Sequence, residues 1–312
     1  MEGMSVVTRL ESRLGLLLLY SIRRLLRRRV GARVHQYKDD KGRTTPWLEL
    51  GRPDAPTLVW LHGFSDRPDG FLRTAARLAT DFRVIAPAVP SFHEGWRDPE
   101  ETHTLSAYAD WLAPVIQSAD PGRYVLVGNS LGGALALELA SRRPAGLCGL
   151  IAVNSAGMEV EGDQSVIDEF QRGQSPFNIR RREQVGILFR RILGRPIRIP
   201  FPFEAALYRE YAQEADWYMR LSDDISNSEI KLIEKGWRSA IDLPSIDVPA
   251  LVLWGDRDTL FPPSHAEKMA QVLPDAQLEW LDGVGHSPHL EQPKRLAQSI
   301  QRFVDSLQMT AA

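Results

Sequence analysis

Cysteine is almost absent from this sequence, which has one, Cys148, in 312 residues. A single thiol cannot close an internal disulfide or supply the thiolates of a multi-cysteine zinc site. An excess of charge is also absent, because 38 basic and 40 acidic residues give a net charge of −2. Residues 34–312 alone have a net charge of −8, so the body of the chain lacks the basic surface that nucleic-acid binding requires, and we expect no nucleic-acid partner. No repeat is visible, and 43% hydrophobic residues suffice for the core of one large domain or two small ones.

Long apolar runs are missing as well. The run Leu14–Ile22 is much shorter than the roughly 20 residues that a membrane-spanning helix needs. Its length suits the core of a signal peptide, but arginines follow it and no small-residue cleavage site is evident. Basic charge gathers around this run: residues 1–33 have a net charge of +6, which leaves −8 for residues 34–312. The arginines responsible are Arg9, Arg13, Arg23, Arg24, Arg27, Arg28, Arg29 and Arg33.

On a helix, the apolar and basic residues of this segment separate onto different sides. The apolar stripe contains Leu10, Leu14, Leu18 and Ile22, flanked by Leu17 and Leu25, and the other side carries Arg9, Arg13, Arg23 and Arg27. Leu16 and Leu19 interrupt the basic side. We therefore predict that residues 1–33 form an uncleaved interfacial helix that binds an anionic membrane surface. The alternative is an amphipathic helix that packs on the protein's own surface or on a second subunit.

The rest of the chain alternates short apolar strands with helices, which is typical of a parallel sheet covered on both faces. A hairpin of Val34–Lys38 and Pro46–Leu50 is expected first. The expected strands are then Thr57–Leu61, Arg83–Ala86, Tyr124–Val127, Leu150–Val153, Ala250–Trp254 and Gln277–Leu281, and the helices are Phe71–Thr80, Ser106–Ser118, Leu131–Arg142, Ser264–Val272 and Pro293–Leu307. Residues 157–240 break this alternation and look mainly helical, with no strong strand. We expect a helical insertion within an α/β core of residues 34–156 and 241–312.

The strand Tyr124–Val127 runs into Gly128-Asn129-Ser130-Leu131-Gly132 and then into an alanine-rich helix. This is a G-x-S-x-G motif in a strand–turn–helix setting, which would lift Ser130 above the carboxyl edge of the sheet. A serine hydroxyl is a weak nucleophile until a base removes its proton, and a helix N-terminus offers free N–H groups to an oxyanion. The motif alone could also be the glycine-rich start of a helix, so further elements have to support it.

Three further elements follow other strands in the expected chain order. They are His62-Gly63-Phe64-Ser65, Gly255-Asp256-Arg257-Asp258 and Gly283-Val284-Gly285-His286. Catalytic groups gather at the carboxyl edge of open α/β sheets. A serine, an acid and a histidine in this order predict a serine nucleophile that a histidine base activates.

On these motifs, the sequence from Val34 to Leu307 resembles the α/β-hydrolase-fold serine hydrolases. Within them it resembles the bacterial monoacylglycerol-lipase-like esterases, relatives of the membrane-attached α/β-hydrolase-domain-6 lipases. The resemblance is carried by HGFSDRPDG at 62–70, LVGNSLGG at 126–133, VNSAG at 153–157, WGDRDTLFP at 254–262, GHSPHLEQP at 285–293 and the stretch from Ile179 to Ala206. It implies an α/β-hydrolase fold, with a mostly parallel eight-stranded sheet flanked by helices and residues 157–240 as a helical cap, or lid, after the sixth strand.

The resemblance also implies an N-terminal hydrophobic anchor. We therefore expect a peripheral position on the cytoplasmic face of a bacterial inner membrane, or otherwise a cytoplasmic protein. The oligomeric state is not implied.

The same resemblance assigns roles to individual residues. Ser130 is expected to be the nucleophile, Asp258 the acid and His286 the base, and the N–H groups of Phe64 and Leu131 are expected to form the oxyanion hole. Asp256 is expected to hold a turn, and His289 to lie at the pocket rim or at a helix entry. His93 and His103 are expected in a surface loop, with a second histidine near the site as the alternative. The chain departs from many relatives at Pro68, Ala88, Ser91 and His93, which are positions beside the pocket.

The implied reaction is hydrolysis of a carboxylic ester, without a metal or an organic cofactor. No H-E-x-x-H or similar spacing predicts a metal site. Most aromatic residues of the cap are expected in a helix core, and some are expected to line an apolar slot for an acyl chain. The candidate substrate-binding residues are Met158, Phe177, Phe203 and Trp217. The expected substrate is a monoacylglycerol or another medium-chain acyl ester.

Two alternatives remain open. The first is a carbon–carbon bond hydrolase of the meta-cleavage-product type, which shares the G-N-S-x-G-G motif. Those enzymes usually have tryptophan after the catalytic histidine, where this chain has Ser287. The second is a membrane-attached ligand-binding protein that keeps the fold without turnover, and an intact triad argues against it.

Overall fold

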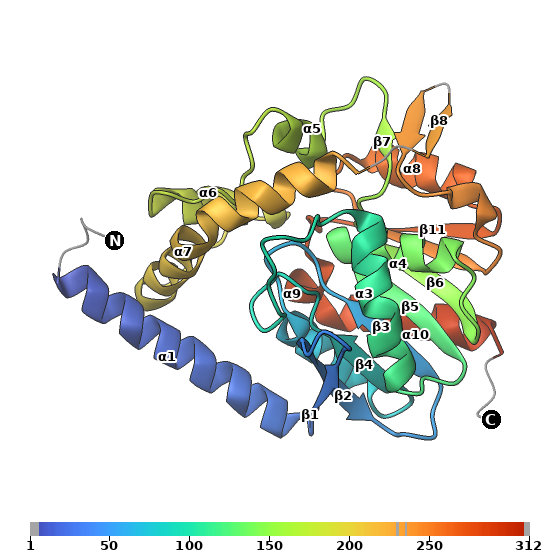
Figure 1. Cartoon of the computed structure of the whole chain (residues 1–312), viewed down its shortest axis with the longest axis horizontal. Helices are drawn as coiled ribbons and strands as arrows, with labels where there is room; N and C mark the ends of the chain where they lie inside the picture. The colour runs from blue at the N-terminus through green and yellow to red at the C-terminus, as the bar shows by residue number, and fades with distance from the viewer. Residues whose placement is uncertain (1–5, 229–230, 235, 309–312) are drawn as a thin grey trace.

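The computed structural model describes residues 6–228, 231–234 and 236–308, and one large sheet forms its centre (Figure 1). The strands of this sheet are β1 (Arg33–Lys38), β2 (Thr44–Gly51), β3 (Thr57–Leu61), β4 (Arg83–Pro87), β5 (Tyr124–Asn129), β6 (Leu147–Val153), β10 (Ala250–Gly255) and β11 (Ala276–Leu281). Their spatial order is β1-β2-β4-β3-β5-β6-β10-β11. Strand β2 runs antiparallel to β1 and β4, and all other neighbours pair in parallel. The expected hairpin and the expected core strands are confirmed.

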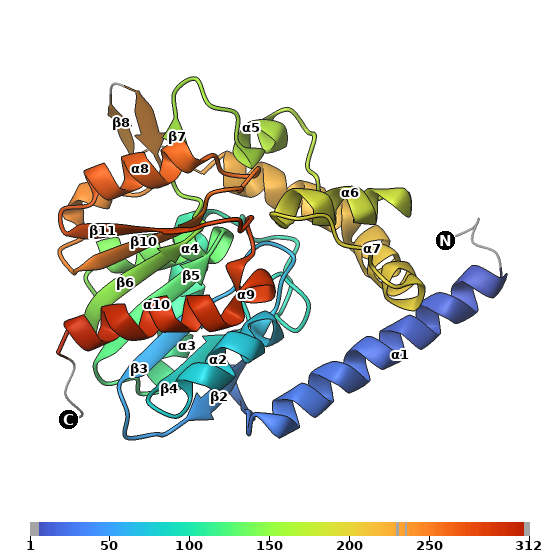
Figure 2. The ribbon, with the colours of Figure 1, turned by 180° about the vertical axis from the view of Figure 1, so that it is seen from behind.

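Helices cover the sheet on both faces (Figures 1 and 2). They are α2 (Leu72–Leu78), α3 (Leu105–Ser118), α4 (Leu131–Ser141), α8 (Pro263–Val272) and α10 (Pro293–Ser306), with the short turns η1 (Pro68–Phe71), η2 (Leu243–Ser245) and α9 (Pro288–Glu291) between them. In β3, Val59 and Leu61 join the core under α3, α4 and α8, whereas Leu58 and Trp60 join the core under α2 and α10. All residues of β3 and β5 are buried, which explains why these strands are continuous apolar runs.

Residues 157–240, called the cap segment here, leave the sheet after β6 and return at β10 (Figure 1). The cap segment contains α5 (Val166–Gln171), α6 (Glu183–Ile192) and α7 (Phe201–Ser226). It also contains a small antiparallel sheet of β7 (Glu159–Val160), β9 (Trp237–Ser239) and β8 (Leu232–Glu234). The segment is mainly helical and has no long strand, as expected, but this small sheet was not predicted. Strands of two or three residues are too short for a period-two pattern to be visible in the sequence.

Helix α1 (Val6–Arg29) is a long rod beside the rest of the molecule, and it passes the start of α7 before the chain enters β1 (Figures 1 and 2). Gly15 is buried at this crossing, because a Cβ there would overlap the carbonyl oxygen of Pro202 and approach Ala206. Leu16 and Leu19 are half-buried on the same side, and Leu26 packs against the core under α2. The leucines that interrupted the basic side therefore mark the side that contacts the protein.

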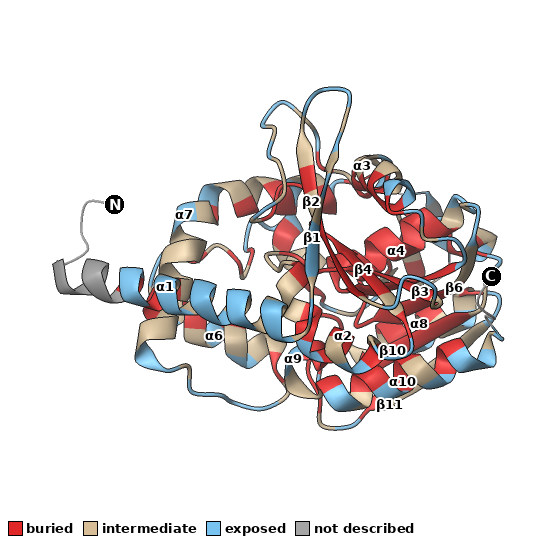
Figure 3. Ribbon diagram, turned by 90° about the horizontal axis from the view of Figure 1, so that it is seen from below, coloured by how far each residue is buried: buried red, intermediate tan, exposed pale blue. Residues whose placement is uncertain are grey.

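The other side of α1 is exposed, as the pale blue surface of the helix in Figure 3 shows. It carries Leu14, Leu17, Leu18, Ile22 and Leu25, all of which are exposed. Arg23 and Arg27 lie on the side opposite this stripe, as expected, but that side faces the protein, where they form ion pairs with Glu210 and Asp69. The side chains of Arg9 and Leu10 lie outside the described part of the structure. None of the helices in the described ranges has an apolar stretch long enough to cross a lipid bilayer.

Candidate active site

Ser130 is the single residue between β5 and α4, with φ 58° and ψ −123°. A positive φ at a residue with a Cβ costs about 1–3 kcal/mol, so the surrounding structure must hold it in place. The flanking glycines allow this turn: a Cβ at Gly128 would overlap the carbonyl oxygen of Gly132, and a Cβ at Gly132 would overlap that of Leu61. The Ser130 carbonyl also accepts a hydrogen bond from the Ala156 N–H at 3.0 Å. The turn thus fixes the serine at the carboxyl end of β5.

His286 and Asp258 come from the loops that follow β11 and β10. His286 Nδ1 lies 2.8 Å from Asp258 Oδ2, and both side chains are buried. The other carboxylate oxygen, Oδ1, accepts the N–H groups of Leu260 and Phe261 at 2.8 and 3.1 Å. A carboxylate fixed in this way holds an imidazole with its proton on Nδ1, which leaves Nε2 free to accept a proton.

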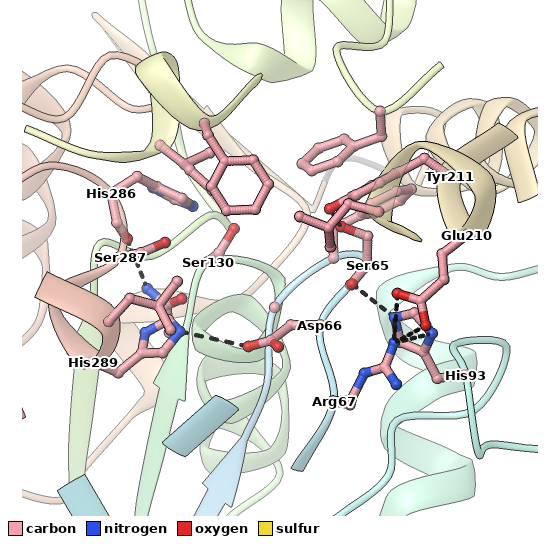
Figure 4. A pocket seen from close by; sticks show the side chains of 18 of the residues that line it. Ser65, Asp66, Arg67, His93, Ser130, Glu210, Tyr211, His286, Ser287 and His289 are labelled. Carbon is pink, nitrogen blue, oxygen red and sulfur yellow. Dashed lines mark hydrogen bonds and ion pairs between the residues drawn. The ribbon is translucent and has the colours of Figure 1, made fainter. Parts of the chain in front are cut away.

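Ser130 and His286 line one cavity of about 150 Å³, and side chains of the cap segment form part of its wall. Figure 4 shows the Ser130 hydroxyl and the His286 ring on the same side of this space. The apolar part of the wall includes Phe64, Phe177, Phe189, Ile192, Leu207 and Leu290. The polar part includes Ser65, Asp66, Arg67, His93, Glu210, Tyr211 and, from helix α1, Arg23. The cavity is therefore amphipathic, with a nucleophile and a base in its wall.

Burial and the neighbours of Asp66 and His93 in the polar wall determine the pKa values of these two side chains. Burial opposes ionisation of Asp66, but His289, whose Nε2 lies 3.5 Å from Asp66 Oδ2, lowers the pKa of Asp66 to about 2. Burial and then the Arg67 guanidinium lower the pKa of His93 to about 3, so this ring is neutral. His93 lies 2.8 Å from Arg67 Nη2 and 2.9 Å from the carbonyl oxygen of Ser65. His93 lines the cavity of Ser130, so the structure favours a second histidine near the site over the surface loop that was expected. Its ring connects Arg67 to the backbone of Ser65, in the loop that also carries Phe64.

The sequence of residues 58–299 matches the model of the alpha/beta hydrolase family. That range covers more than three quarters of the chain and contains Ser130, Asp258 and His286. The chain belongs to the alpha/beta hydrolase family. The α/β-hydrolase fold expected from the sequence is thereby confirmed, with eight mostly parallel strands and the insertion after the sixth.

This α/β-hydrolase is similar to curated and solved lipases. It is 25% identical to Lipase 3 of Moraxella sp. (strain TA144) over 251 residues, which cover 80% of this chain and 78% of that lipase. It is 24% identical to Monoacylglycerol lipase ABHD6 of Mus musculus over 279 residues, which cover 83% and 79% of the two chains. Among solved structures, a membrane phospholipase A described as a novel bacterial virulence factor has a TM-score of 0.85 and 26% identity, over 95% of this chain and 93% of that one.

Phe64 and Leu131 stand beside Ser130 in this α/β-hydrolase. Leu131 is the first residue of α4, so its N–H precedes the first hydrogen bond within the helix. The loop with Phe64 runs against the serine, because a Cβ at Gly63 would lie only 3.1 Å from Ser130 Cβ. The Phe64 ring packs on Phe177 with ring centroids 4.6 Å apart. The structure thus brings these residues together, and their role as oxyanion donors stays a prediction.

The residues expected to bind substrate lie in different places. Phe177 lines the cavity of Ser130 and His286. Met158 lines a separate cavity of about 50 Å³ that does not include Ser130. Phe203 and Trp217 line neither cavity, and the Trp217 indole N–H donates to the Ser91 carbonyl at 2.9 Å. The sequence of the cap segment could not separate these residues, because which of them reach the cavity depends on how the cap packs on the core.

Asn154, at the end of β6, is a part of the site that the sequence analysis missed. Its Nδ2 donates to Asp258 Oδ2 at 2.7 Å, and its Oδ1 accepts the N–H of Gly255 at 3.2 Å. Its position within the VNSAG segment, directly after a core strand, was the available signal. Asp256 instead accepts the N–H groups of Gly283 and Val284, which is the loop-holding role expected for it.

Two further observations complete the site. His103 is buried, with Nδ1 3.0 Å from Asp224 Oδ2, and so does not lie in the surface loop expected for it. Among the described residues, no three His, Cys, Asp or Glu side chains are grouped so that they could hold a metal ion.

Proposed function

We propose that this α/β-hydrolase is a serine hydrolase that cleaves carboxylic esters of lipid-like substrates, such as monoacylglycerols or other medium-chain acyl esters. The observation that carries the proposal is the strained Ser130 in the same cavity as His286, whose ring is held by the buried Asp258. The names of similar proteins, Lipase 3 and Monoacylglycerol lipase ABHD6, support an ester substrate.

The reaction follows from these positions. His286 Nε2 takes the proton of the Ser130 hydroxyl as its oxygen attacks the ester carbonyl carbon, and Asp258 stabilises the imidazolium that forms. The N–H groups of Phe64 and Leu131 stabilise the oxyanion of the tetrahedral intermediate, and one such donor is worth about 3–4 kcal/mol. His286 then protonates the leaving alcohol. A water molecule, deprotonated by the same ring, hydrolyses the acyl-enzyme and regenerates Ser130.

The apolar surroundings of Ser130 are suited to binding the acyl chain of an ester substrate. A small cavity of about 20 Å³ beside Ser130 is lined by apolar side chains that include Phe64 and Phe177. Leu131 and Ile225 line this small cavity and also the cavity that contains Met158, so the two are neighbours. An acyl chain that enters this region gains about 0.8 kcal/mol for each CH₂ group it buries. This supports esters of medium chain length.

We also propose that α1 holds the enzyme on an anionic membrane surface as a peripheral protein. The exposed leucines of α1, Leu17 and Leu25 among them, form an apolar stripe that the protein leaves uncovered. Arg28 and Arg29 at the end of the helix are also exposed. An apolar stripe with neighbouring arginines suits the boundary between lipid head groups and acyl chains.

The catalytic proposal is tested with p-nitrophenyl esters of increasing chain length and with a fluorophosphonate probe. We expect wild-type enzyme to hydrolyse the esters and to be labelled at Ser130. Ser130→Ala should lose at least about a thousandfold in kcat and all labelling, because it removes the nucleophile. Ser141→Ala, at the far end of α4, is the matched control and should keep both.

Three outcomes would contradict this proposal. Unchanged ester turnover in Ser130→Ala would show that Ser130 is not the nucleophile. Hydrolysis of a vinylogous 1,5-diketone without any ester hydrolysis would favour the carbon–carbon bond hydrolase. Tight ligand binding by a chain that the fluorophosphonate does not label would favour a binding protein.

A further inference from the structure

Helix α1 contributes a side chain to the wall of the candidate active site. Arg23 lines the same cavity as Ser130 and His286, although it lies in the first helix of the chain. Its side chain is 25% exposed, and its Nη1 lies 3.6 Å from Glu210 Oε1. Arg67, from the loop before η1, approaches the same oxygen of Glu210 at 3.4 Å. One carboxylate is therefore shared by two guanidinium groups.

The other acidic groups nearby are engaged elsewhere. Asp66 turns toward His289 and away from Arg67, as Figure 4 shows. Asp69 is bound by Arg27, whose Nε donates to it at 2.6 Å, and Arg27 Nη2 also reaches Glu94 at 3.2 Å. His93 beside Arg67 is neutral and adds no charge. At the end of the cavity that holds Arg23, Arg67 and Glu210, two guanidinium groups thus share one carboxylate.

Burial and a neighbouring like charge both act on Arg23. Desolvation and then the charge of Arg67 lower the pKa of Arg23, while Glu210, Asp69 and Glu94 oppose the shift. Guanidinium groups bind phosphate and carboxylate with paired N–H donors, and such charge-assisted bonds are stronger in a partly buried site than in water. A ligand anion between the two arginines would accept such bonds from both.

We propose that Arg23 and Arg67 form a subsite for an anionic group, a phosphate above all, on the alcohol part of the ester substrate. The inference rests on the proposed ester hydrolysis and names its substrate class. The acyl chain is assigned to the apolar side of the cavity, so the alcohol part lies toward the polar end. Arg23 is then a specificity-determining residue, and α1 is part of the substrate-binding site as well as a membrane contact.

The test uses two soluble esters with the same acyl chain, octanoyl glycerol and octanoyl glycerol 3-phosphate, below their aggregation concentrations and without vesicles. Full-length wild-type enzyme should show a higher kcat/KM for the phosphate ester. Arg23→Gln should reduce this preference by about tenfold or more, because it raises KM for the phosphate ester with little change in its kcat. Arg23→Lys should keep part of the preference. Arg77→Gln, an exposed arginine of α2, should change neither ester.

A second variant shifts the preference in the opposite direction. Glu210→Gln removes the shared carboxylate, so it should lower KM for the phosphate ester and increase the preference. A purely structural role for this ion-pair group would instead reduce turnover of both esters in Glu210→Gln and in Arg23→Gln. Parallel loss of both esters, or an unchanged preference in Arg23→Gln, would overturn the subsite.

Two further measurements separate the possible failures. Inhibition of octanoyl glycerol hydrolysis by inorganic phosphate, without any preference between the two esters, would assign the arginines to a free anion and overturn the head-group assignment. If wild-type enzyme hydrolyses neither ester, the proposed function fails by itself. Calorimetric binding of octanoyl glycerol 3-phosphate to Ser130→Ala, with and without Arg23→Gln, then still decides whether the subsite exists.

Discussion

Asp258 shows how tightly single residues are fixed in the candidate active site. It accepts hydrogen bonds from the N–H groups of Leu260 and Phe261, from Asn154 Nδ2 and from His286 Nδ1. A carboxylate with its oxygens occupied in this way cannot rotate away from the imidazole. The precise orientation of His286 therefore depends on Asn154 as well as on Asp258.

Glu159 is a residue with a pH-dependent effect on stability. Burial raises the pKa of this carboxyl, ordinarily 4.5, to about 7, and nearby Asp168 adds to the shift while the Ser165 hydroxyl, which donates at 2.6 Å, opposes it. Because the folded state holds this proton more tightly than the unfolded state, stability falls as the pH rises from 4.5 to about 7 and changes no further above it.

Glu159→Gln removes this titration and keeps an oxygen that accepts the Ser165 hydroxyl. We expect its unfolding free energy to match wild type near pH 4.5 and to exceed it by up to about 3 kcal/mol above pH 7. Denaturant unfolding at pH 4.5, 6 and 8 measures the difference. A difference that is the same at all three pH values would show that Glu159 does not titrate in this range.

At the residue scale, the sequence could predict the groups that are joined to a local motif. Ser130 has its glycines, and Asp258 and His286 each follow a core strand, so their meeting at one edge could be expected. Asn154 follows a core strand within the VNSAG segment, but this position alone does not give its role, because its partner Asp258 is more than 100 residues away. Arg23 has no such local signal, and its partner Glu210 is also more than 100 residues away. Long-range polar contacts of this kind depend on how elements pack, which periodicity does not encode.

At the scale of elements, the crossing of α1 and α7 decides where Arg23 lies. The two helices touch at Gly15, where a side chain would overlap Pro202 and Ala206. Farther along α1, Arg27 binds Asp69 of η1. The sequence predicted the helix and its apolar stripe, but it could not say which side would face the protein. Both sides of the helix contain leucines, so hydrophobicity does not distinguish them. The close approach to α7 depends on Gly15, and a glycine adds nothing to a hydrophobic pattern.

Gly15→Ala tests this crossing, because alanine normally stabilises the interior of a helix by about 1 kcal/mol relative to glycine. At Gly15 the added methyl group must displace α1, so we expect destabilisation of about 1–3 kcal/mol. We also expect the preference for octanoyl glycerol 3-phosphate to fall. Gly186→Ala in α6, where a Cβ meets only the end of the Arg190 side chain, is the matched control and should stabilise. Equal effects of the two substitutions on unfolding would contradict a tight contact at Gly15.

At the scale of the whole molecule, the outer side of α1 stands out because it exposes several large apolar side chains. The leucines of α1 lie on the outside of the molecule, on a helix that the remaining chain contacts only from one side (Figure 3). The overall architecture was predictable, because buried strands and their alternation with helices specify a parallel sheet. The small sheet of the cap segment was not, because its strands are too short to show a pattern.

The double variant Leu17→Glu with Leu25→Glu tests the proposed membrane contact. Both side chains are about two-thirds exposed, at 65% and 66%, so the folded protein should be unaffected. We expect partitioning to vesicles of phosphatidylglycerol and phosphatidylcholine to fall by at least about tenfold, because two leucine side chains that would be buried in the lipid are replaced by charged ones. Ile233→Glu, at an exposed apolar position of β8, is the control and should partition like wild type. Equal partitioning of all three proteins would refute the contact.

The presence of Arg23 in the cavity wall has a practical consequence for studies of this enzyme. A shortened version that starts at β1, chosen because it is easier to purify, would have one side of its binding site missing. Kinetic constants measured on it would describe a more open and less positive cavity than that of the full chain. Inhibitors selected against it would be fitted to a shape that the intact enzyme does not have.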